Sequence, residues 1–457
     1  MGMLRQKNDI TQGVIWKQLL IFFFPLLFGM FFQQLYNTVD AVVVGRFVGK
    51  TALAAVGSTG VIVGLTVGIF TGLSSGAVVV IAQHYGARRG EEAHRAVHTA
   101  MLISVIAGVF FTVIGFILTP WALRAMDTPA DALEDAILYL RIYFLGMLPN
   151  LVYNMGTGVL RAIGDSKRPF YFLVVASVCN IVLDLALVIW LHMGVAGAAI
   201  ATVFSQLLSA VLVVGSLMNS SGECYQFFPR AMCLDKKEFA VIMKVGIPTA
   251  LQSVMYSASN IVIQAVINSF GTDAVAAWTA YGKMDIVFWM SLSSMAQALT
   301  TFAGQNYGAG KYDRVKRSIW ISAGMCMGAT IPICTIMYVL ARPFLSIFGT
   351  DPGVLEIGVE MVQFLVPTYF TYILVELLPG AMRGAGKSVG PMVITVFGVC
   401  AVRFLWLFLV VPRWHTLIMV EASYPITWSI TSIALLIYYR FSNWLQPAER
   451  VETGEMI

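Results

Sequence analysis

Long apolar runs set the strongest limit on what this chain can fold into. Twelve of them, each close to the roughly 20 residues that a helix needs to cross a bilayer, alternate with short polar segments. The runs span residues 14–36, 53–82, 97–119, 134–159, 170–192, 195–217, 239–268, 274–302, 318–340, 355–380, 391–411 and 417–439. With 58% hydrophobic and 12% charged residues, the chain is too apolar for a soluble protein of its length. Because strand-like alternation is missing as well, we predict an all-α polytopic membrane protein with twelve transmembrane helices.

Lys and Arg are distributed unevenly between the loops, and this predicts the orientation of the chain. Positive residues stay on the cytoplasmic side of short loops. One set of alternating segments, which includes both chain ends, carries most of the positive charge. The opposite set holds only Arg46, Lys50, Arg124, Arg342 and Arg413. We therefore expect a multi-pass protein of the cytoplasmic (inner) membrane with both termini in the cytoplasm. The net charge of +5 is then a topology signal, and no nucleic-acid partner is expected.

Two motifs recur 222 residues further along the chain. The segment 83–87, Gln-His-Tyr-Gly-Ala, returns at 305–309 as Gln-Asn-Tyr-Gly-Ala, and the glycine-containing turn that follows Arg161 returns after Arg383. Two motifs at one spacing indicate an internal duplication, which is common in transporters. Each half then contains six spans, and an even number makes both halves enter the membrane in the same direction. We predict two six-helix bundles related by a pseudo-two-fold axis along the membrane normal.

The duplication also predicts the domain boundaries. The polar stretch 219–238, which contains Gly222 and Pro229, is the natural cytoplasmic linker. We expect the N-terminal lobe over residues 1–218, the C-terminal lobe over 239–441 and a cytoplasmic tail over 442–457.

Glycine recurs at every fourth position of the second predicted span. The positions are Gly60, Gly64, Gly68, Gly72 and Gly76. Small residues at this spacing let two helix backbones approach closely in lipid. The stripe fits either close packing inside the fold or a homodimer face. We favour packing inside the fold and expect a monomer.

Polar side chains inside the apolar runs of the first half carry the functional expectation. Gln33, Asn37 and Asp40 lie on one helix face, and Asn180 and Asp184 share another. Ionisable groups within a membrane usually face a bundle interior or a water-filled cavity and mark a functional site. Their oxygens suit a small hard cation such as Na⁺, while two carboxylates in a low-dielectric cavity repel, so that one can carry a proton. Two alternatives stay open: a polar network that only fastens helices together, and Asp40 as the cap of a helix end.

The second half does not copy these carboxylates. The repeat offset takes Asp40 to Val262 and Asp184 to Trp406, neither of which exchanges protons. The spans of the second half hold other ionisable residues, namely Lys283, Asp285, Glu376 and Arg403.

We expect Glu376 to pair with Lys283 or Arg403, and contact with a cation or substrate is the alternative. Aromatic residues such as Tyr256 suit a cavity for apolar cations, because a ring face attracts positive charge. The sequence alone does not show which of these aromatic residues line a cavity.

Neither catalysis nor nucleotide hydrolysis is expected. No HExxH pattern occurs, and the five histidines show no metal-binding pattern beyond His94 and His98, which lie four residues apart in a basic loop. The segment 380–388 ends like a nucleotide-binding loop, but Ala381 occupies the place of its first glycine. We therefore predict that the chain is not an enzyme and uses no organic cofactor. Any pumping must be driven by an ion gradient.

These features together resemble the multidrug and toxic compound extrusion (MATE) transporters of prokaryotic type. The similarity covers residues 10 to 440 and rests on the two six-helix halves, the segment 33–40, the Gly-Ala-Ala-Ile-Ala-Thr run at 197–202 and the Arg-Ala-Ile-Gly-Asp turn at 161–165. It implies a V-shaped pair of bundles around a central cavity. It also implies export of organic, mostly cationic compounds against entering Na⁺ or H⁺.

The resemblance implies site residues in the N-terminal lobe as well. The cation site falls on Asp40, Asn180, Asp184 and Thr202, with Gln34 and Asn154 as neighbours. The residue patterns add further cavity candidates, namely Asn37, Tyr256, Lys283, Asp285 and Glu376. A flippase for lipid-linked precursors is the alternative, since relatives of this architecture move such substrates. That reading needs a strongly cationic cavity, and the few basic residues within the spans favour the exporter.

Overall fold

The structure is a computed structural model that describes residues 10–445 apart from Asp127 and Thr350. This part of the chain is helical throughout and contains no strand. The first half comprises α1 (Ile15–Val43), η1 (Val44–Val48), α2 (Lys50–Gly86), α3 (Gly90–Ala125), α4 (Ala130–Leu145), α5 (Met147–Ala162), α6 (Lys167–Asp184), η2 (Leu185–Trp190) and α7 (Gly194–Met218). After the short turn η3 (Pro229–Ala231), the second half comprises α8 (Lys236–Asn268), α9 (Thr272–Met284), α10 (Ile286–Gly308), α11 (Tyr312–Val339), α12 (Ala341–Ser346), α13 (Pro352–Leu365), η4 (Val366–Tyr372), α14 (Ile373–Gly384), α15 (Val389–Thr395), η5 (Val396–Ala401), α16 (Val402–Leu409) and α17 (Leu417–Phe441).

Within the described residues, eleven helical segments are long and apolar enough to cross a membrane, and the bent pair α4 and α5 makes twelve. The predicted all-α polytopic fold is therefore confirmed. Two predicted spans are broken. Helices α4 and α5 meet at 46° on either side of Gly146, and the predicted span 274–302 is interrupted at Asp285, between α9 and α10. The predicted tail begins at residue 442, and its residues 446–457 lie outside the described residues.

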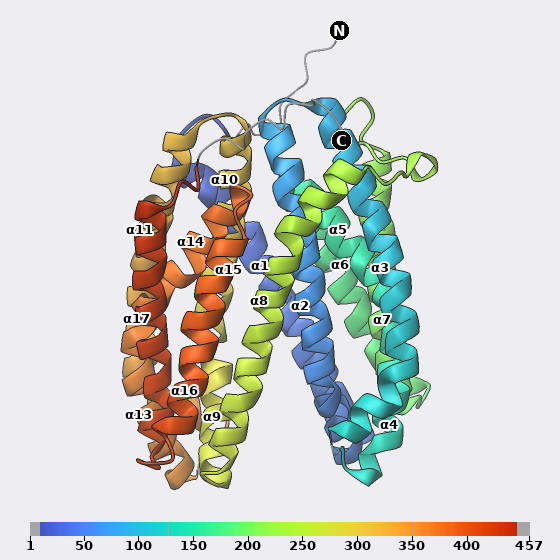
Figure 1. Ribbon diagram of the computed structural model, residues 1–457. Coiled ribbons are helices and arrows are strands. Elements are labelled where there is room, and N and C mark those ends of the chain that lie inside the picture. Colours follow the sequence, from blue (N-terminus) through green and yellow to red (C-terminus); the bar gives the residue numbers. More distant parts are fainter. Residues whose placement is uncertain (1–9, 127, 350, 446–457) are drawn as a thin grey trace, which may run out of the picture.

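The helices form two bundles that diverge toward one end (Figure 1). Two helices, α1 and α8, cross between the bundles. Leu19 and Phe22 of α1 belong to the hydrophobic core of the C-terminal lobe, whereas Val43 at the end of the same helix belongs to the N-terminal lobe. Helix α8 does the reverse, because Ile242 packs in the N-terminal lobe and Ile263 in the C-terminal lobe. Each lobe is therefore completed by half a helix from the other.

The glycine stripe of α2 explains where the bundles touch and where they part. A Cβ atom at Gly72 or Gly76 would collide with the backbone of α8, at Ala250 and Ile242 respectively. At Gly60 nothing lies within 4 Å of such an atom. The two helices are thus in backbone contact along one half of α2 and separated along the other. Packing inside the fold, the favoured interpretation of the stripe, holds at Gly72 and Gly76, whereas nothing lies within 4 Å of a Cβ atom at Gly60 or Gly64.

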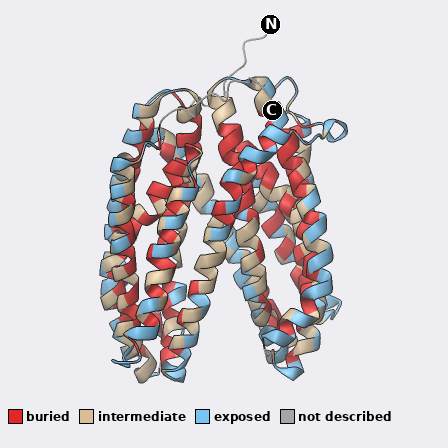
Figure 2. Ribbon diagram, in the orientation of Figure 1, coloured by how far each residue is buried: buried red, intermediate tan, exposed pale blue. Residues whose placement is uncertain are grey.

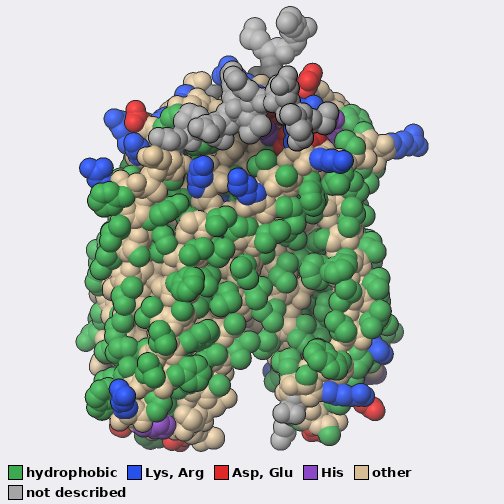
Figure 3. Space-filling model, in the orientation of Figure 1, with side chains coloured by type: hydrophobic (Ala, Val, Ile, Leu, Met, Phe, Trp, Pro, Cys, Tyr) green, Lys and Arg blue, Asp and Glu red, His purple; other side chains and the backbone are tan. Residues whose placement is uncertain are grey.

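Charge separates the two ends of the molecule and leaves an apolar belt between them. Figure 3 shows hydrophobic side chains around the middle and Lys and Arg gathered mainly at one end, here called the basic end. At the opposite end the space-filling surface is split by a cleft between the lobes (Figure 3). Buried residues line the inward faces of the bundles, and exposed residues, many of them hydrophobic, face outward (Figure 2). Such a wide exposed apolar surface fits a lipid environment.

Candidate functional sites in the two lobes

An acidic pair lies inside the N-terminal lobe. Asp40 sits close to the end of α1, and Asp184 is the last residue of α6. The π-turn η2 follows Asp184 directly, and the π-turn η1 begins at Val44, four residues after Asp40. The two π-turns are in contact. Because π-turns leave the regular i to i−4 ladder, they occur frequently at functional sites. The carboxylates of Asp40 and Asp184 are close enough to interact electrostatically.

The polar atoms of this site have few partners within the protein. The exposed fraction is 8% for Asp40, 1% for Asn180, 0% for Asp184 and 6% for Thr202. Among the described residues, no hydrogen-bond partner lies near Oδ1 of Asp40, either carboxylate oxygen of Asp184, or the side-chain oxygen and nitrogen of Asn180. Buried polar groups without a partner are costly, so they are rare where they serve no purpose.

The donor set of this N-lobe site fits a small cation or a proton. Asp40 and Asp184 supply anionic oxygens, and Asn180 supplies a neutral amide oxygen with no protein partner. Thr202 donates its hydroxyl hydrogen to the carbonyl of Ala198 at 3.0 Å, which leaves the oxygen lone pairs available. Oxygen ligands of this mixed kind suit hard cations. The four residues singled out from the sequence are therefore all buried in one lobe, where Asp40 and Asp184 interact, and their joint binding of a cation stays a prediction.

Two tyrosines that were not predicted from the sequence, Tyr36 and Tyr139, lie near the acidic pair, and a third, Tyr143, packs on Tyr139. Tyr36 and Tyr139 each interact electrostatically with both Asp40 and Asp184. The ring of Tyr139 stacks on that of Tyr143 at a centroid distance of 6.3 Å. The spacing contained a signal, since Tyr36 precedes Asp40 by four residues and Tyr139 precedes Tyr143 by four. Their hydroxyl groups place further polar atoms in an otherwise apolar interior.

The other candidates predicted in the N-terminal lobe are Gln34, Asn37 and Asn154, and none of them is fully buried. Asn37 is exposed, and Gln34 is half-buried. Asn154 is used within its own helix, because its Nδ2 donates to the carbonyl of Asn150 at 2.9 Å. The backbone carbonyl of Asn154 accepts a hydrogen bond of 2.9 Å from Ser74 of α2. Asn154 therefore helps to join α5 to α2.

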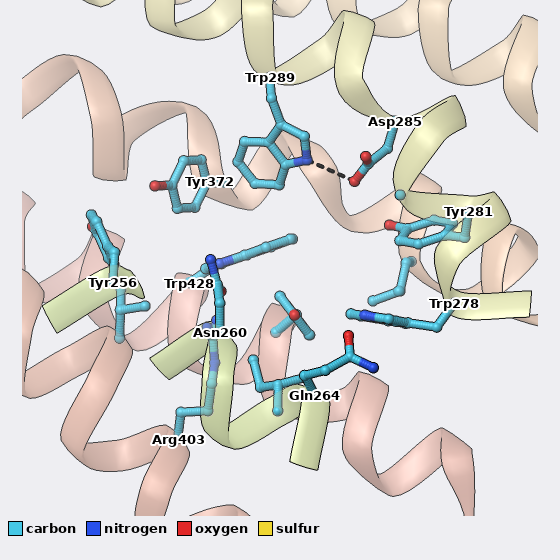
Figure 4. A pocket seen from close by; sticks show the side chains of 15 residues that line it. Tyr256, Asn260, Gln264, Trp278, Tyr281, Asp285, Trp289, Tyr372, Arg403 and Trp428 are labelled. Atoms are coloured by element: carbon cyan, nitrogen blue, oxygen red, sulfur yellow. Dashed lines mark hydrogen bonds between the residues drawn. The ribbon is translucent and has the colours of Figure 1, made fainter. Parts of the chain in front are cut away.

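A second candidate site is a cavity of about 480 Å³ in the C-terminal lobe (Figure 4). It is lined by Tyr256, Asn260, Ile263, Gln264, Trp278, Tyr281, Gly282, Asp285, Trp289, Leu365, Tyr372, Val399, Arg403, Tyr424 and Trp428. Three tryptophans and four tyrosines make seven of these fifteen lining residues aromatic. Concave, largely apolar cavities of this size with a few polar groups are typical small-molecule sites.

Asp285 lines this cavity at the point where the helix is interrupted, between α9 and α10. The carboxylate accepts hydrogen bonds from Trp289 Nε1 at 2.6 Å and from the Tyr369 hydroxyl at 3.2 Å. The hydroxyls of Tyr369 and Tyr281 are hydrogen-bonded to each other. Helix α2, the repeat counterpart, runs through this level without a break, so the feature is specific to the second half. Lys283 is exposed and does not line the cavity.

The predicted pairing of Glu376 with Lys283 or Arg403 is wrong. Among the described residues, no ion pair joins Glu376 to either of them. Glu376 accepts a hydrogen bond of 3.4 Å from the hydroxyl of Tyr372 and interacts electrostatically with Arg383. Lys283 fails as a partner because it points to the protein surface. Arg403 fails because hydroxyl groups of other helices hold its guanidinium.

Comparison with known proteins identifies the chain. The MatE family model matches residues 25–186 and again 248–409, so one model covers both halves of the duplication. The probable multidrug resistance protein YoeA of Bacillus subtilis is 29% identical over 439 residues, which are 93% of this chain and 94% of that protein. The probable multidrug resistance protein NorM of Thermotoga maritima is 24% identical over 408 residues, covering 87% and 85%.

The fold agrees with this family. A solved structure described as the outward-facing conformation of a multidrug resistance MATE family transporter superimposes with a TM-score of 0.88 at 22% identity, over 96% of this chain and 98% of that one. Members of the family are transporters and not enzymes. A duplicated, membrane-spanning helical fold, matched by one family model in both halves, therefore shows that this chain belongs to the multidrug and toxic compound extrusion (MATE) family of efflux transporters.

Proposed function

We propose that this protein is a secondary active exporter that antiports organic, mostly cationic and amphipathic compounds against Na⁺ or H⁺. The observation that carries the proposal is the set of unpartnered, buried polar atoms of Asp40, Asn180 and Asp184. Two carboxylates that interact in a membrane-embedded lobe are expensive to keep. Binding of a cation or a proton removes that cost, and this makes the site sensitive to an ion gradient.

The path of α1 offers a physical link between this site and the other lobe. Asp40 lies on the part of α1 that packs in the N-terminal lobe, while Leu19 near its start packs in the C-terminal core. Pro25 lies between them and removes one backbone hydrogen bond. An ion that changes the packing around Asp40 therefore acts on a helix shared by both lobes. Ion and substrate then oppose each other through negative coupling, typically of about 1–3 kcal/mol.

The distribution of charge supports an orientation. Positive residues gather at the basic end (Figure 3), and we infer that this end faces the cytoplasm. Both termini then lie in the cytoplasm, the protein spans the inner membrane, and the cleft at the opposite end opens outward. The high structural similarity to an outward-facing relative supports the same assignment. We also propose that the protein acts as a monomer.

A flippase of related architecture is not favoured. Arg403 is the one basic side chain among the residues that line the C-lobe cavity, and Asp285 lines it as well. A pyrophosphate headgroup needs several cationic groups in one place. The N-lobe site offers two carboxylates, which would repel such a headgroup.

Dye efflux from proteoliposomes tests the proposal. A Na⁺ gradient and a proton gradient are imposed separately on vesicles that contain the wild type, Asp40→Asn or Glu134→Gln. Glu134 is an exposed acid of α4 and serves as the matched control. We expect one gradient to drive efflux by the wild type and the control, and neither to drive it by Asp40→Asn. Normal efflux by Asp40→Asn, with the variant folded in detergent, would refute the proposal.

A further inference from the structure

The C-lobe cavity contains a buried guanidinium without an anionic partner. Arg403 is 3% exposed and lies on α16, directly after the π-turn η5. Its Nη1 donates to the hydroxyl of Ser259 and its Nη2 to the hydroxyl of Thr427, both at 3.3 Å. Its Nε has no hydrogen-bond partner, and among the described residues no carboxylate forms an ion pair with it.

Neutral contacts orient this cation without neutralising it. The guanidinium lies over the ring of Tyr424 at 4.3 Å from the centroid, and the face of an aromatic ring attracts positive charge only weakly. The hydroxyls of Ser259 and Thr427 accept two of the five N–H donors of an arginine. Arg168 provides a contrast, because its Nε donates to the carboxylate of Asp165 at 2.5 Å. A buried charge that is held in position but left unpaired is poised to bind an anion.

The opposite end of the same cavity is acidic. Figure 4 shows Asp285 and Arg403 on opposite sides of the labelled residues, with the indole of Trp428 between them. The rings of Trp289 and Trp428 meet edge to face, with centroids 5.9 Å apart. Flat aromatic molecules bury a large area against such rings. The cavity therefore combines an aromatic wall with charges of opposite sign at its two ends.

We propose that the C-lobe cavity binds flat aromatic compounds that carry an anionic group, such as a carboxylate, and that this group pairs with Arg403. A positively charged amine on the same compound faces Asp285. This inference rests on the proposed function, because it places the anionic group of an exported compound at Arg403 in the C-lobe cavity. Arg403 sets the specificity for the anionic end, since a planar guanidinium matches a carboxylate with two parallel hydrogen bonds.

The test uses two dyes that differ by one charge. Rhodamine B carries a free carboxylate on a flat cationic ring system, and its ethyl ester lacks only that negative charge. Binding of each dye to the purified full-length protein in detergent is followed by fluorescence polarisation, with empty micelles subtracted. We expect the wild type to bind rhodamine B. Arg403→Met should weaken binding of rhodamine B by about thirtyfold or more, while binding of the ester changes by less than about threefold.

Three further variants make the result specific. Arg403→Lys keeps the charge but loses the planar pair of hydrogen bonds, so its affinity for rhodamine B should lie between those of the wild type and Arg403→Gln. This pair decides the question if Arg403→Met does not fold. Arg342→Met, at an exposed arginine, should bind both dyes like the wild type. The inference is overturned if the wild type does not bind rhodamine B, if the charge-removing variants leave its binding unchanged, or if they weaken both dyes equally.

The dye experiment is independent of ion coupling, because binding in detergent needs no gradient. If Asp40→Asn transports normally while dye binding depends on Arg403, the proposed antiport fails and the anion site stands. If gradient-driven efflux depends on Asp40 while dye binding ignores the charge at 403, the antiport stands and the anion site fails.

Discussion

Gln83, near the end of α2, donates a hydrogen bond of 2.8 Å from Nε2 to the backbone carbonyl of Gly384 in the other lobe. Its repeat counterpart Gln305 donates one of 2.6 Å to the carbonyl of Ala162, the counterpart of Gly384. Both acceptors are the last residues of their helices, α14 and α5, where backbone carbonyls lack a partner in the helix. The duplicated motifs therefore meet in a reciprocal pair of bonds, which holds the lobes together at the basic end.

The double variant Gln83→Ala/Gln305→Ala should open the basic end more often than the wild type. Two neutral hydrogen bonds of about 1 kcal/mol each shift a two-state equilibrium by about thirtyfold. Spin labels at the exposed positions 91 and 316, in a cysteine-free background, report the separation of the lobes by double electron–electron resonance. Gln226→Ala is the control, because Gln226 donates to the carbonyl of Met218 within one lobe. An unchanged distance distribution would show that the two bonds do not hold the closed state.

Gly86→Ala and Gly308→Ala should each favour separation at the basic end more strongly. A Cβ at Gly86 collides with the backbone of Gln305, and one at Gly308 collides with the backbone of Gln83. Since neither backbone can move aside alone, the lobes must separate. Gly324→Ala on α11 is the control, with nothing within 4 Å of its new atom. The same spin-label distances should lengthen in the first two variants only, and a lengthening in Gly324→Ala would point to a nonspecific effect.

The helical fold was predictable because a bilayer leaves the backbone almost no choice. Runs of about 20 apolar residues can satisfy their hydrogen bonds only as helices, and the repeat offset then gave two bundles. The acidic site was predictable in part, since Asp40 and Asp184 are carboxylates in spans where charge is costly. Helical spacing also placed Asn180 on the face of Asp184.

Contacts between helices were harder to predict. Spacing along the chain gives the face of a residue on its own helix but not its neighbour across a lobe, and the expected pairing of Glu376 failed for this reason. The break at Asp285 was missed because its segment 274–302 is apolar enough to be read as one span. Gln83 and Gln305 each donate a hydrogen bond to the other lobe. The repeat shows that the two residues correspond, but it does not show how the two lobes pack against each other.

Asp235→Ala should destabilise the start of α8. The carboxylate accepts hydrogen bonds from the backbone N–H of Lys237 at 2.9 Å and of Glu238 at 3.2 Å, and loss of such a cap costs about 1 kcal/mol. The backbone N–H of Glu238, with further contributions from Lys237 and Arg95, lowers the pKa of the Asp235 carboxyl. Its contribution is therefore full above the ordinary Asp pKa of about 4 and is lost as the pH falls through the lower folded value.

Thermal unfolding in detergent at neutral pH and at about pH 3 checks this prediction. Asp235→Asn is the control, because asparagine caps a helix without titrating. We expect Asp235→Ala to unfold at a lower temperature than Asp235→Asn at neutral pH. The difference between wild type and Asp235→Asn should change on acidification. Equal unfolding temperatures for the alanine and asparagine variants at neutral pH would contradict the role of the cap.

Asp40 and Asp184 should behave as one unit in transport. If both carboxylates bind a single coupling ion, loss of either removes the site, so the effects of the two substitutions do not add. Gradient-driven efflux should fall to the background level in Asp40→Asn and in Asp184→Asn, and the double variant should be no worse. A double variant that loses clearly more activity than each single variant would indicate two independent ion sites.

Thermal stability in detergent should identify the coupling ion without any transport. Removing two interacting, buried carboxylates relieves their repulsion, so Asp40→Asn/Asp184→Asn should unfold at a higher temperature than the ion-free wild type. If Na⁺ is the coupling ion, replacing choline chloride by NaCl stabilises the wild type, by about 2.7 kcal/mol at a hundredfold excess over Kd, and leaves the double variant unchanged. If H⁺ is the coupling ion, acidification has this effect instead and Na⁺ has none. Equal responses of wild type and double variant to both ions would place the coupling site elsewhere in the protein.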